Sequence, residues 1–250
     1  MKKLHTLELQ DLAKAIERQE MDLNASSLSF DERLVLILED VISERERRHM
    51  NRLIRNAFLK YPDASIESLD YESRELTREN IIHLAKMSFV ETATNLVITG
   101  PAGAGKTYLA CALGVEACKH SYRTFYVRMN DFLRNMEHLR DNVKEMKKYL
   151  RRISNYHVLI MDEWLAHVLS DKEAKNLYEL LELRKGVNPT IFVGQYSMDD
   201  WYDRLGGGAT AESILDRIVH NAYPIKSNET NLRRKYDEMK LRQFLESMNE

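Results

Sequence analysis

The pattern of apolar and polar positions divides this chain into three blocks. Residues 1–70 have apolar positions at helical spacing and predict a small all-α N-terminal domain. In residues 71–228, short apolar runs alternate with helical patterns, which indicates an α/β domain with a parallel sheet between helices. Residues 229–250 predict a charged C-terminal helical tail. Few residues follow Arg217, so we expect any helical lid to be minimal or absent.

The first block predicts two amphipathic helices, one of them over residues 4–16. The second should begin after Ser29, because Ser29 and Glu32 have the spacing of a capping box, and it must end before Pro62. Its second half is rich in arginine. That face is equally consistent with a solvated helix surface and with a surface that binds nucleic acid or a protein partner.

Five short apolar runs in the second block predict the strands of the sheet. These runs are residues 95–99, 123–128, 157–161, 190–194 and 222–226. Between the second and third runs, apolar residues recur from Phe132 to Ile153 at alternating spacings of four and three. This spacing predicts either one long helix or two helices in tandem.

A phosphate-binding motif follows the first predicted strand. Residues 100–107 have the sequence Gly-Pro-Ala-Gly-Ala-Gly-Lys-Thr, which fits the P-loop pattern between a strand and a helix. In such a loop, backbone N–H groups surround phosphate oxygens, the lysine reaches the β- and γ-phosphates, and the threonine hydroxyl binds Mg²⁺. We therefore expect ATP to be bound by Gly100, Pro101, Ala102, Gly103, Ala104, Gly105, Lys106, Thr107 and Tyr108.

A pair of carboxylates follows the third predicted strand. Asp162 and Glu163 leave a buried apolar run, and charges at the carboxyl end of such a strand face a crevice rather than a core. In a chain with a P-loop, we expect Asp162 to hold Mg²⁺ together with Thr107, and Glu163 to orient or deprotonate the attacking water. The alternative is an ordinary acidic pair at the end of a strand, which would be favoured if the segment stood alone.

Composition and charge are typical of an enzyme of modest size. The chain has 250 residues and a formal net charge of −2, so any affinity for nucleic acid must come from local patches. No apolar stretch approaches the roughly 18 residues of a membrane span, and no secretion leader is recognisable, so we expect a cytoplasmic protein. Cys111 and Cys118 are expected to be small core residues of the helix after the P-loop.

A basic stripe lies in the helical region between the second and third predicted strands. Residues 123–152 hold nine Lys or Arg against four Asp or Glu. At about 100° per residue, five of the basic side chains fall on one helix flank, which is typical of a surface that follows nucleic-acid phosphates. A solvated flank with ion pairs to Asp141 and Glu145 is the alternative. The basic stripe consists of Arg140, Lys144, Lys147, Lys148 and Arg151, and we expect it to contact the backbone of duplex DNA.

The later segments distinguish between classes of P-loop protein. Residues 190–195 form an apolar run that ends in an amide, where AAA+ proteins place the sensor of the γ-phosphate, and residues 214–219 resemble the helix that carries the AAA+ arginine finger. Together with residues 28–34, 114–118 and 161–163, these segments resemble the IstB-like ATPases. Those are helper proteins of insertion-sequence transposition, related to DnaC helicase loaders and DnaA initiators.

The resemblance implies an AAA+ core that forms homo-oligomers with ATP, assembles on duplex DNA, and recruits or activates a transposase. It also implies that Gln195 senses the γ-phosphate and that Arg217 acts on the ATP of a neighbouring subunit. Two positions depart from the family pattern. The chain has Val-Gly-Gln at residues 193–195 where Thr-Ser-Asn is common, and Trp164-Leu165 where a Gly-Tyr pair is frequent. The predicted catalytic residues are Lys106, Glu163, Gln195 and Arg217.

Two other functions remain possible from the sequence. A DnaC-like loader of a replicative helicase would share the same ATPase motifs, but it would prefer single-stranded DNA to duplex. A small-molecule P-loop kinase is disfavoured, because the Asp-Glu pair and Arg217 suit attack by water in an oligomer and no lid of useful size follows.

Overall fold

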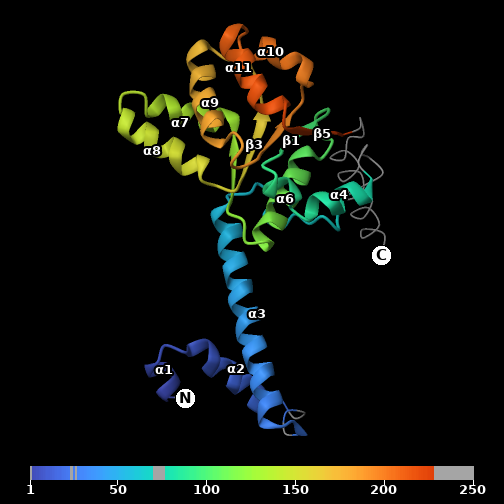
Figure 1. Ribbon diagram of the computed structural model, residues 1–250, viewed down its shortest axis with the longest axis vertical. Helices are drawn as coiled ribbons and strands as arrows, with labels where there is room; N and C mark the ends of the chain where they lie inside the picture. Colours follow the sequence, from blue (N-terminus) through green and yellow to red (C-terminus); the bar gives the residue numbers. More distant parts are fainter. Residues whose placement is uncertain (1, 23–24, 26, 70–76, 228–250) are drawn as a thin grey trace, which may run out of the picture. The chain divides into compact units, whose positions relative to one another are not determined.

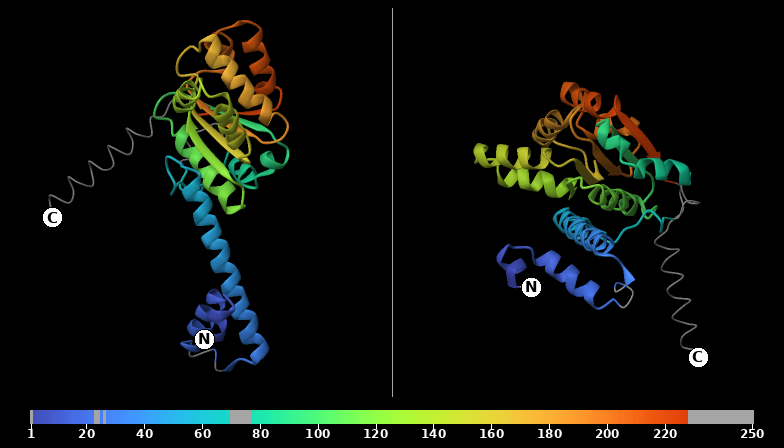
Figure 2. Two further views of the ribbon diagram at one scale, coloured as in Figure 1. Left: turned by 90° about the vertical axis from the view of Figure 1, so that its left-hand side faces the viewer. Right: turned by 60° about the horizontal axis from the view of Figure 1, so that its bottom comes forward.

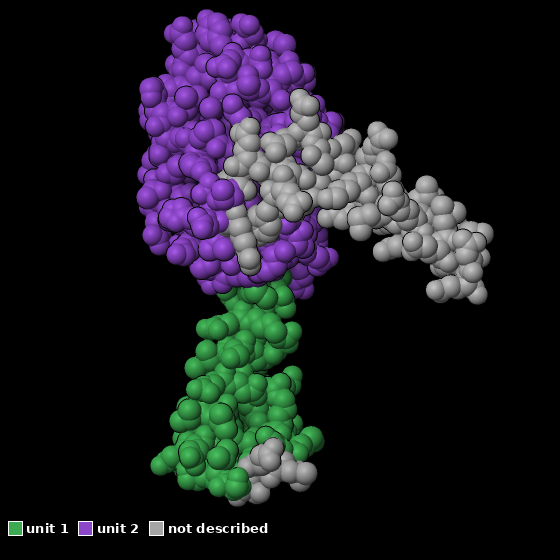
Figure 3. Space-filling model, turned by 90° about the vertical axis from the view of Figure 1, so that its right-hand side faces the viewer, with its two compact units in different colours: residues 1–52 green, residues 53–250 purple. Residues whose placement is uncertain are grey.

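The computed structural model describes residues 2–22, 25, 27–69 and 77–227. It contains two compact units, Met1–Arg52 and Leu53–Glu250, which are coloured separately in Figure 3. Residues 53–69 thus belong to the unit that holds the sheet, while the domain boundary expected near residue 70 stays a prediction. The predicted tail, residues 229–250, lies outside the described residues, and so does any lid built from it.

The first unit is helical. Two helices, α1 (Lys2–Thr6) and α2 (Gln10–Glu20), stand where one was predicted, and α3 (Phe30–Asn56) begins at the predicted capping box. There the Ser29 N–H donates to the Glu32 carboxylate over 2.8 Å, and the Glu32 N–H donates to Ser29 Oγ over 3.4 Å. Helix α2 lies beside α3 in Figures 1 and 2, and ion pairs such as Arg48–Asp11, at 2.6 Å, join them.

The second unit is built on a five-stranded, all-parallel sheet in the order β2-β3-β4-β1-β5. All five predicted strands are present, and the third continues through the Asp-Glu pair. The strands are β1 (Asn95–Thr99), β2 (Thr124–Arg128), β3 (Val158–Trp164), β4 (Thr190–Gly194) and β5 (Ala222–Lys226). The predicted fold class is therefore confirmed.

Two hydrophobic cores cover the two faces of the sheet, because successive side chains of a strand point to opposite faces. Ile98 and Ile160 belong to one core, together with α4 (Arg78–Ala85), α5 (Ser88–Glu91) and α6 (Lys106–Lys119). Val97 and Phe192 belong to the other. That core is formed with α7 (Met129–His138), α8 (Val143–Ser154), α9 (Asp171–Arg184), α10 (Trp201–Arg204) and α11 (Gly208–Val219), and the layers are visible in Figure 1.

The apolar seam from Phe132 to Ile153 forms two helices rather than one. Helix α7 ends at His138, and α8 begins after Asn142, whose side-chain oxygen accepts a hydrogen bond from the Glu145 N–H over 3.2 Å. This cap satisfies the start of the second helix, so the polar stretch between the helices forms a turn. Figure 1 shows α7 and α8 as an antiparallel pair beside the sheet.

Edge strand β2 is covered on its outer side by the chain that follows α3. The Tyr126 N–H donates to the Ala57 carbonyl over 2.8 Å, and the Phe58 ring packs edge-on against Phe125 with centroids 6.0 Å apart. These contacts satisfy an edge that would otherwise expose unpaired backbone groups. Cys111 and Cys118 are buried on α6 as predicted, and burial raises the pKa of the Cys111 thiol to about 11.

Candidate active site

The P-loop lies between β1 and α6, at the carboxyl edge of the sheet. Gly103 and Gly105 have φ angles of 84° and 72°, a left-handed conformation that glycine adopts at little cost. Gly105 is the N-cap of α6, a helix of 14 residues. The loop therefore opens directly onto a helix N-terminus, where backbone N–H groups and the helix dipole favour a bound anion.

Lys106 lies at the first position of α6 and is only 8% exposed. Its ammonium group donates hydrogen bonds to the carbonyls of Gly100 and Pro101, both over 2.7 Å. These carbonyls hold the ammonium against the P-loop. Phosphate oxygens bound in the loop would carry more negative charge than the carbonyls, and could therefore take over these bonds.

Asp162 is the centre of the polar cluster at this edge, and it is 3% exposed. Thr107 Oγ1 donates to its Oδ2 over 3.0 Å, so the P-loop threonine and the aspartate of β3 are in contact. The Tyr126 hydroxyl donates to the same oxygen over 2.7 Å, and the Glu163 N–H donates to Oδ1 over 2.9 Å. The carboxylate is therefore held by three donors.

The oxygen atoms of Thr107 and Asp162 are ligands that fit Mg²⁺. Mg²⁺ prefers oxygen ligands, and it is usually bound by one or two protein oxygens with phosphates and waters filling the other positions. Thr107 and Asp162 offer a hydroxyl and a carboxylate within 3.0 Å of each other. No group of three or more His, Cys, Asp or Glu that could hold a metal occurs among the described residues. The site thus suits a metal that arrives with a nucleotide.

Glu163 occupies a bulge in β3. The register with β4 shifts between Met161 and Trp164, and Glu163 has a φ of 56°. A left-handed conformation at a residue other than glycine costs about 1 kcal/mol or more, and a bulge changes the direction of a side chain. The bulge therefore sets the direction of the Glu163 side chain at the carboxyl edge. Its role toward water stays a prediction.

The two departures from the family pattern touch each other in the structure. Trp164 is 1% exposed and packs against Phe192 and Trp201, with centroids 4.5 and 5.4 Å away. A Cβ added to Gly194 would lie 3.0 Å from the Trp164 carbonyl oxygen, closer than most Cβ contacts. The glycine therefore accommodates the backbone of the tryptophan. Gln195 follows at the carboxyl end of β4, between β1 and β3, and is exposed.

Tyr108 follows the P-loop threonine on α6 and points to the segment after α3. Its hydroxyl accepts a hydrogen bond from the Ser65 N–H over 3.3 Å and lies 2.6 Å from Ser68 Oγ. The ring lies 5.8 Å from that of Tyr61. These contacts tie residues 61–68 to the start of α6.

Arg217 is not part of this cluster. It lies near the end of α11, and its carbonyl is 3.5 Å from the side-chain nitrogen of Asn95, the first residue of β1. This is the amino edge of the sheet, opposite the P-loop. Its guanidinium donates to the Glu182 carboxylate, to the Tyr178 hydroxyl over 2.7 Å and to the Ser213 carbonyl over 2.7 Å. Arg217 therefore cannot reach the ATP site of its own chain.

The model of the IstB-like ATP binding protein family matches residues 2–239. The chain belongs to this family.

Two curated proteins illustrate the similarity. The protein named "Putative insertion sequence ATP-binding protein y4pL" of Sinorhizobium fredii is 34% identical over 93% of this chain and 94% of its own length. The "Insertion sequence IS1162 putative ATP-binding protein" of Pseudomonas fluorescens is 35% identical over 78% of this chain and 84% of its own. The similarity to such proteins thus extends over nearly the whole chain.

Solved structures show the same fold at low identity. The structure of DnaI matches with a TM-score of 0.57 and 22% identity, over 72% of this chain and 99% of that one. A DnaA structure bound to AMPPCP and single-stranded DNA matches with a TM-score of 0.56 and 21% identity, over 75% of this chain and 56% of that one. These structures show the AAA+ fold of the chain, and its family shows that it is an ATP-binding protein and ATPase.

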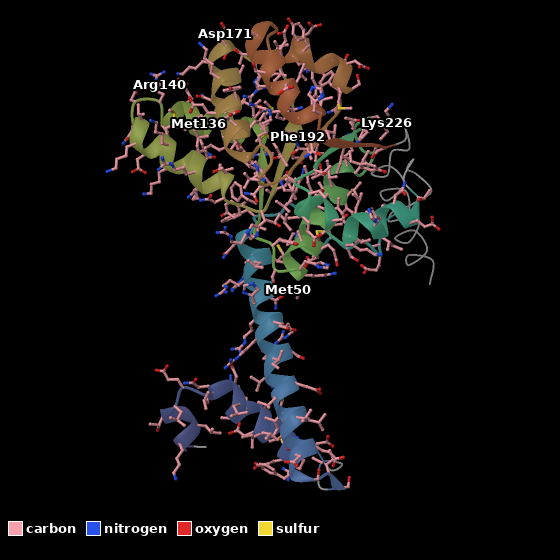
Figure 4. All side chains as sticks on the ribbon, viewed as in Figure 1. Met50, Met136, Arg140, Asp171, Phe192 and Lys226 are labelled. Atoms are coloured by element: carbon pink, nitrogen blue, oxygen red, sulfur yellow. The ribbon has the colours of Figure 1, made fainter. Side chains whose placement is uncertain are left out.

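The basic stripe of this IstB-like protein lies on α8 and in the turn before it. Figure 4 shows Arg140 at the turn that joins α7 and α8. Arg140 pairs with Glu137 and Asp141, and Lys148 lies 3.6 Å from Glu145. Within residues 77–227, no ion pair involves the other three members of the stripe, and all five are exposed.

The described helices include none that is long and apolar enough to cross a membrane.

Proposed function

We propose that this IstB-like protein is a Mg²⁺-dependent ATPase that forms homo-oligomers on duplex DNA and recruits or activates a transposase. The separation of Arg217 from the P-loop carries the proposal. The residues that would bind and cleave ATP lie at the carboxyl edge, whereas the arginine lies at the amino edge. If Arg217 takes part in hydrolysis, it must do so on a second copy of the chain.

The contact of Thr107 with Asp162 at the carboxyl edge supports the following roles. The P-loop amides and Lys106 bind the phosphates, and Thr107 and Asp162 supply the oxygens for Mg²⁺. When bound, Mg²⁺ would neutralise charge on the β- and γ-phosphates. Glu163 accepts a proton from the attacking water or orients it, and Gln195 contacts the γ-phosphate or that water.

The arginine of a neighbouring subunit would complete the site. An arginine finger supplied by a second molecule raises turnover by about 10³- to 10⁵-fold in well-studied NTPases. Hydrolysis by this protein would then depend on assembly. The Arg217 side chain is 14% exposed and its partner Glu182 is 52% exposed, so Arg217 would have to exchange its bonds to Glu182, Tyr178 and Ser213 for a phosphate oxygen of the neighbouring subunit.

The DNA partner is supported by the basic stripe, and the transposase by the relatives. Lys144, Lys147 and Arg151 are exposed, with no carboxylate partner in the described part of the chain. Such side chains suit phosphates of a duplex, whose contacts carry affinity but little sequence information. The curated relatives are named as ATP-binding proteins of insertion sequences, which favours a transposase as the protein partner.

Sedimentation velocity tests the proposal directly. The protein is measured with ATP and Mg²⁺ in the presence of long duplex DNA, of single-stranded DNA of equal length, and without DNA. A large ATP-dependent species on duplex DNA is expected. Assembly on single strands alone would identify a helicase loader instead, and a monomer under all three conditions would contradict the role of Arg217 in a neighbouring site.

A further inference from the structure

Tyr126 makes a contact with the metal site that no motif predicts. It lies in the middle of β2, the strand next to β3 in the sheet, and its hydroxyl donates to Asp162 Oδ2 over 2.7 Å. The same oxygen accepts the Thr107 hydroxyl over 3.0 Å. A single carboxylate oxygen is thus shared by a P-loop residue and a residue from a neighbouring strand.

The backbone of Tyr126 is fixed on both sides. Tyr126 lies opposite Ile160 in the parallel pairing of β2 with β3, and its own N–H donates to the Ala57 carbonyl over 2.8 Å. Its ring packs against the core that α6 forms with the sheet. The hydroxyl therefore reaches Asp162 from a rigid support, which is the condition for a side chain that orients another.

For packing alone, an apolar side chain would be enough at position 126. The Tyr126 hydroxyl nevertheless makes a hydrogen bond to Asp162. A buried hydroxyl without a hydrogen bond is costly, whereas a bond to a charged acceptor contributes about 1.5–3 kcal/mol. A tyrosine hydroxyl keeps its proton at neutral pH, so the group remains a donor. Thr107 must turn its oxygen to the metal, but Tyr126 has no such second task.

We propose that Tyr126 is a positioning residue for Mg²⁺: its hydroxyl fixes the orientation of Asp162, so that the carboxylate faces the metal before the nucleotide arrives. The inference rests on the proposed function of Thr107 and Asp162 as the metal site. Loss of a partner that orients a metal ligand typically lowers metal affinity by about 10- to 100-fold. Tyr126→Phe, which removes one oxygen atom, should therefore raise the Mg²⁺ requirement by about tenfold or more.

The test separates metal binding from nucleotide binding. In a Glu163→Gln background, which slows hydrolysis, the affinity for a fluorescent ATP analogue is measured in EDTA and across a Mg²⁺ titration. Tyr126→Phe should shift the Mg²⁺ midpoint and leave the affinity in EDTA unchanged. Tyr122→Phe is the matched control, because it removes the same atom from a tyrosine that packs against the same core just before β2. The Tyr122 ring lies beside His157, with centroids 5.7 Å apart. The control should shift neither quantity.

The outcomes distinguish the inference from the proposed function. Asp162→Asn, measured in the same way, should abolish the Mg²⁺ dependence of nucleotide binding. If Asp162→Asn has this effect and Tyr126→Phe leaves the Mg²⁺ midpoint unchanged, the inference about Tyr126 is wrong and the metal site stands. If Asp162→Asn has no effect, the proposed metal site itself is wrong. A Tyr126→Phe protein that melts earlier, with unaltered Mg²⁺ dependence, would assign Tyr126 a purely structural role.

Discussion

The carboxyl and amino edges of the sheet both hold charged side chains, but in different ways. At the carboxyl edge, Lys106 is bonded to loop carbonyls, and Asp162 accepts bonds from the hydroxyls of Thr107 and Tyr126. The loop carbonyls and the Thr107 hydroxyl are neutral, so a phosphate can replace the carbonyls at Lys106, and a cation can replace the Thr107 hydroxyl at Asp162, with a gain in charge pairing. The carboxyl edge is thus arranged to receive a ligand.

The amino edge holds two arginines that differ in the burial and the partners of their side chains. Arg184 is 2% exposed and donates to Thr190 Oγ1 over 3.0 Å and to backbone carbonyls such as that of Tyr156 over 2.8 Å. Burial lowers the pKa of its guanidinium to about 9. Arg217 is 14% exposed and pairs with an exposed glutamate, and both arginines line a pocket of about 330 Å³. Arg184 is bonded wholly within the fold, whereas Arg217 has one partner, Glu182, at the surface.

The largest expected effect comes from Arg217→Ala. This protein should bind ATP normally but lose assembly-dependent hydrolysis by about 10³-fold or more, because the transition-state charge on the neighbour's ATP loses its partner. ATP turnover is measured with and without duplex DNA. Glu182→Gln is the matched control, because it removes the exposed partner and keeps the arginine; its turnover should be equal or higher. Full turnover in Arg217→Ala would contradict the role of Arg217 as an arginine finger.

Glu163→Gln tests the carboxyl edge alone. Hydrolysis should fall by about 10²- to 10⁴-fold, the usual contribution of a general base, while ATP binding remains. The protein should accumulate as an ATP-bound oligomer, detected by sedimentation and by the nucleotide content of the isolated complex. Hydrolysis at the parental rate would exclude Glu163 from the catalytic role.

The basic stripe lies on neither of the two edges. Changing Lys144, Lys147 and Arg151 to Glu together should weaken duplex binding and flatten its salt dependence, since each lost phosphate contact lowers the slope by about 0.9. The affinity is measured at several salt concentrations, with Lys144→Glu compared with Lys175→Glu on α9, because each of these single variants changes the net charge by the same amount. An unchanged slope would place the DNA site elsewhere, with the arginine-rich part of α3 as the next candidate.

The smallest effect on ATP turnover is expected from Arg184→Met. Its guanidinium donates to oxygens of α8, β4 and the turns beside them, and these would lose their donor inside the protein. We expect the free energy of unfolding in urea to fall by about 2–4 kcal/mol, because unsatisfied buried acceptors are costly. ATP binding at the other edge should persist at low temperature. An unchanged free energy of unfolding would show that the acceptors find other hydrogen-bond donors when the Arg184 guanidinium is removed.

The sequence predicted the sheet, and it marked the segments of the candidate site, for a physical reason. Strands buried on both faces leave continuous apolar runs, and the P-loop and the Asp-Glu pair are local patterns with fixed spacing. The contact of Thr107 with Asp162 then follows from the chemistry of a P-loop. Local patterns also explain why the start of α3 at Ser29 was predicted correctly.

Contacts that depend on the order of the strands could not be predicted. Tyr126 reaches Asp162 because β2 lies next to β3, and no local pattern encodes that neighbourhood. The contact of Trp164 with Gly194 is of the same kind, although both departures from the family pattern were visible in the sequence. The apolar seam from Phe132 to Ile153 left one or two helices open, because its spacing continues through the turn that Asn142 ends.

Gly100, the first glycine of the P-loop, is constrained from outside the loop as well. A Cβ at this position would lie 2.6 Å from the carbonyl oxygen of Ser227, which follows β5, and Gly100 has a φ of 146°. An alanine here would collide with the backbone of a neighbouring segment even when no nucleotide is present. Failure of such a variant would therefore report a packing defect as readily as a loss of ATP binding. The Lys106 side chain donates to the loop carbonyls of Gly100 and Pro101, so a change at Lys106 tests the loop without a collision at Ser227.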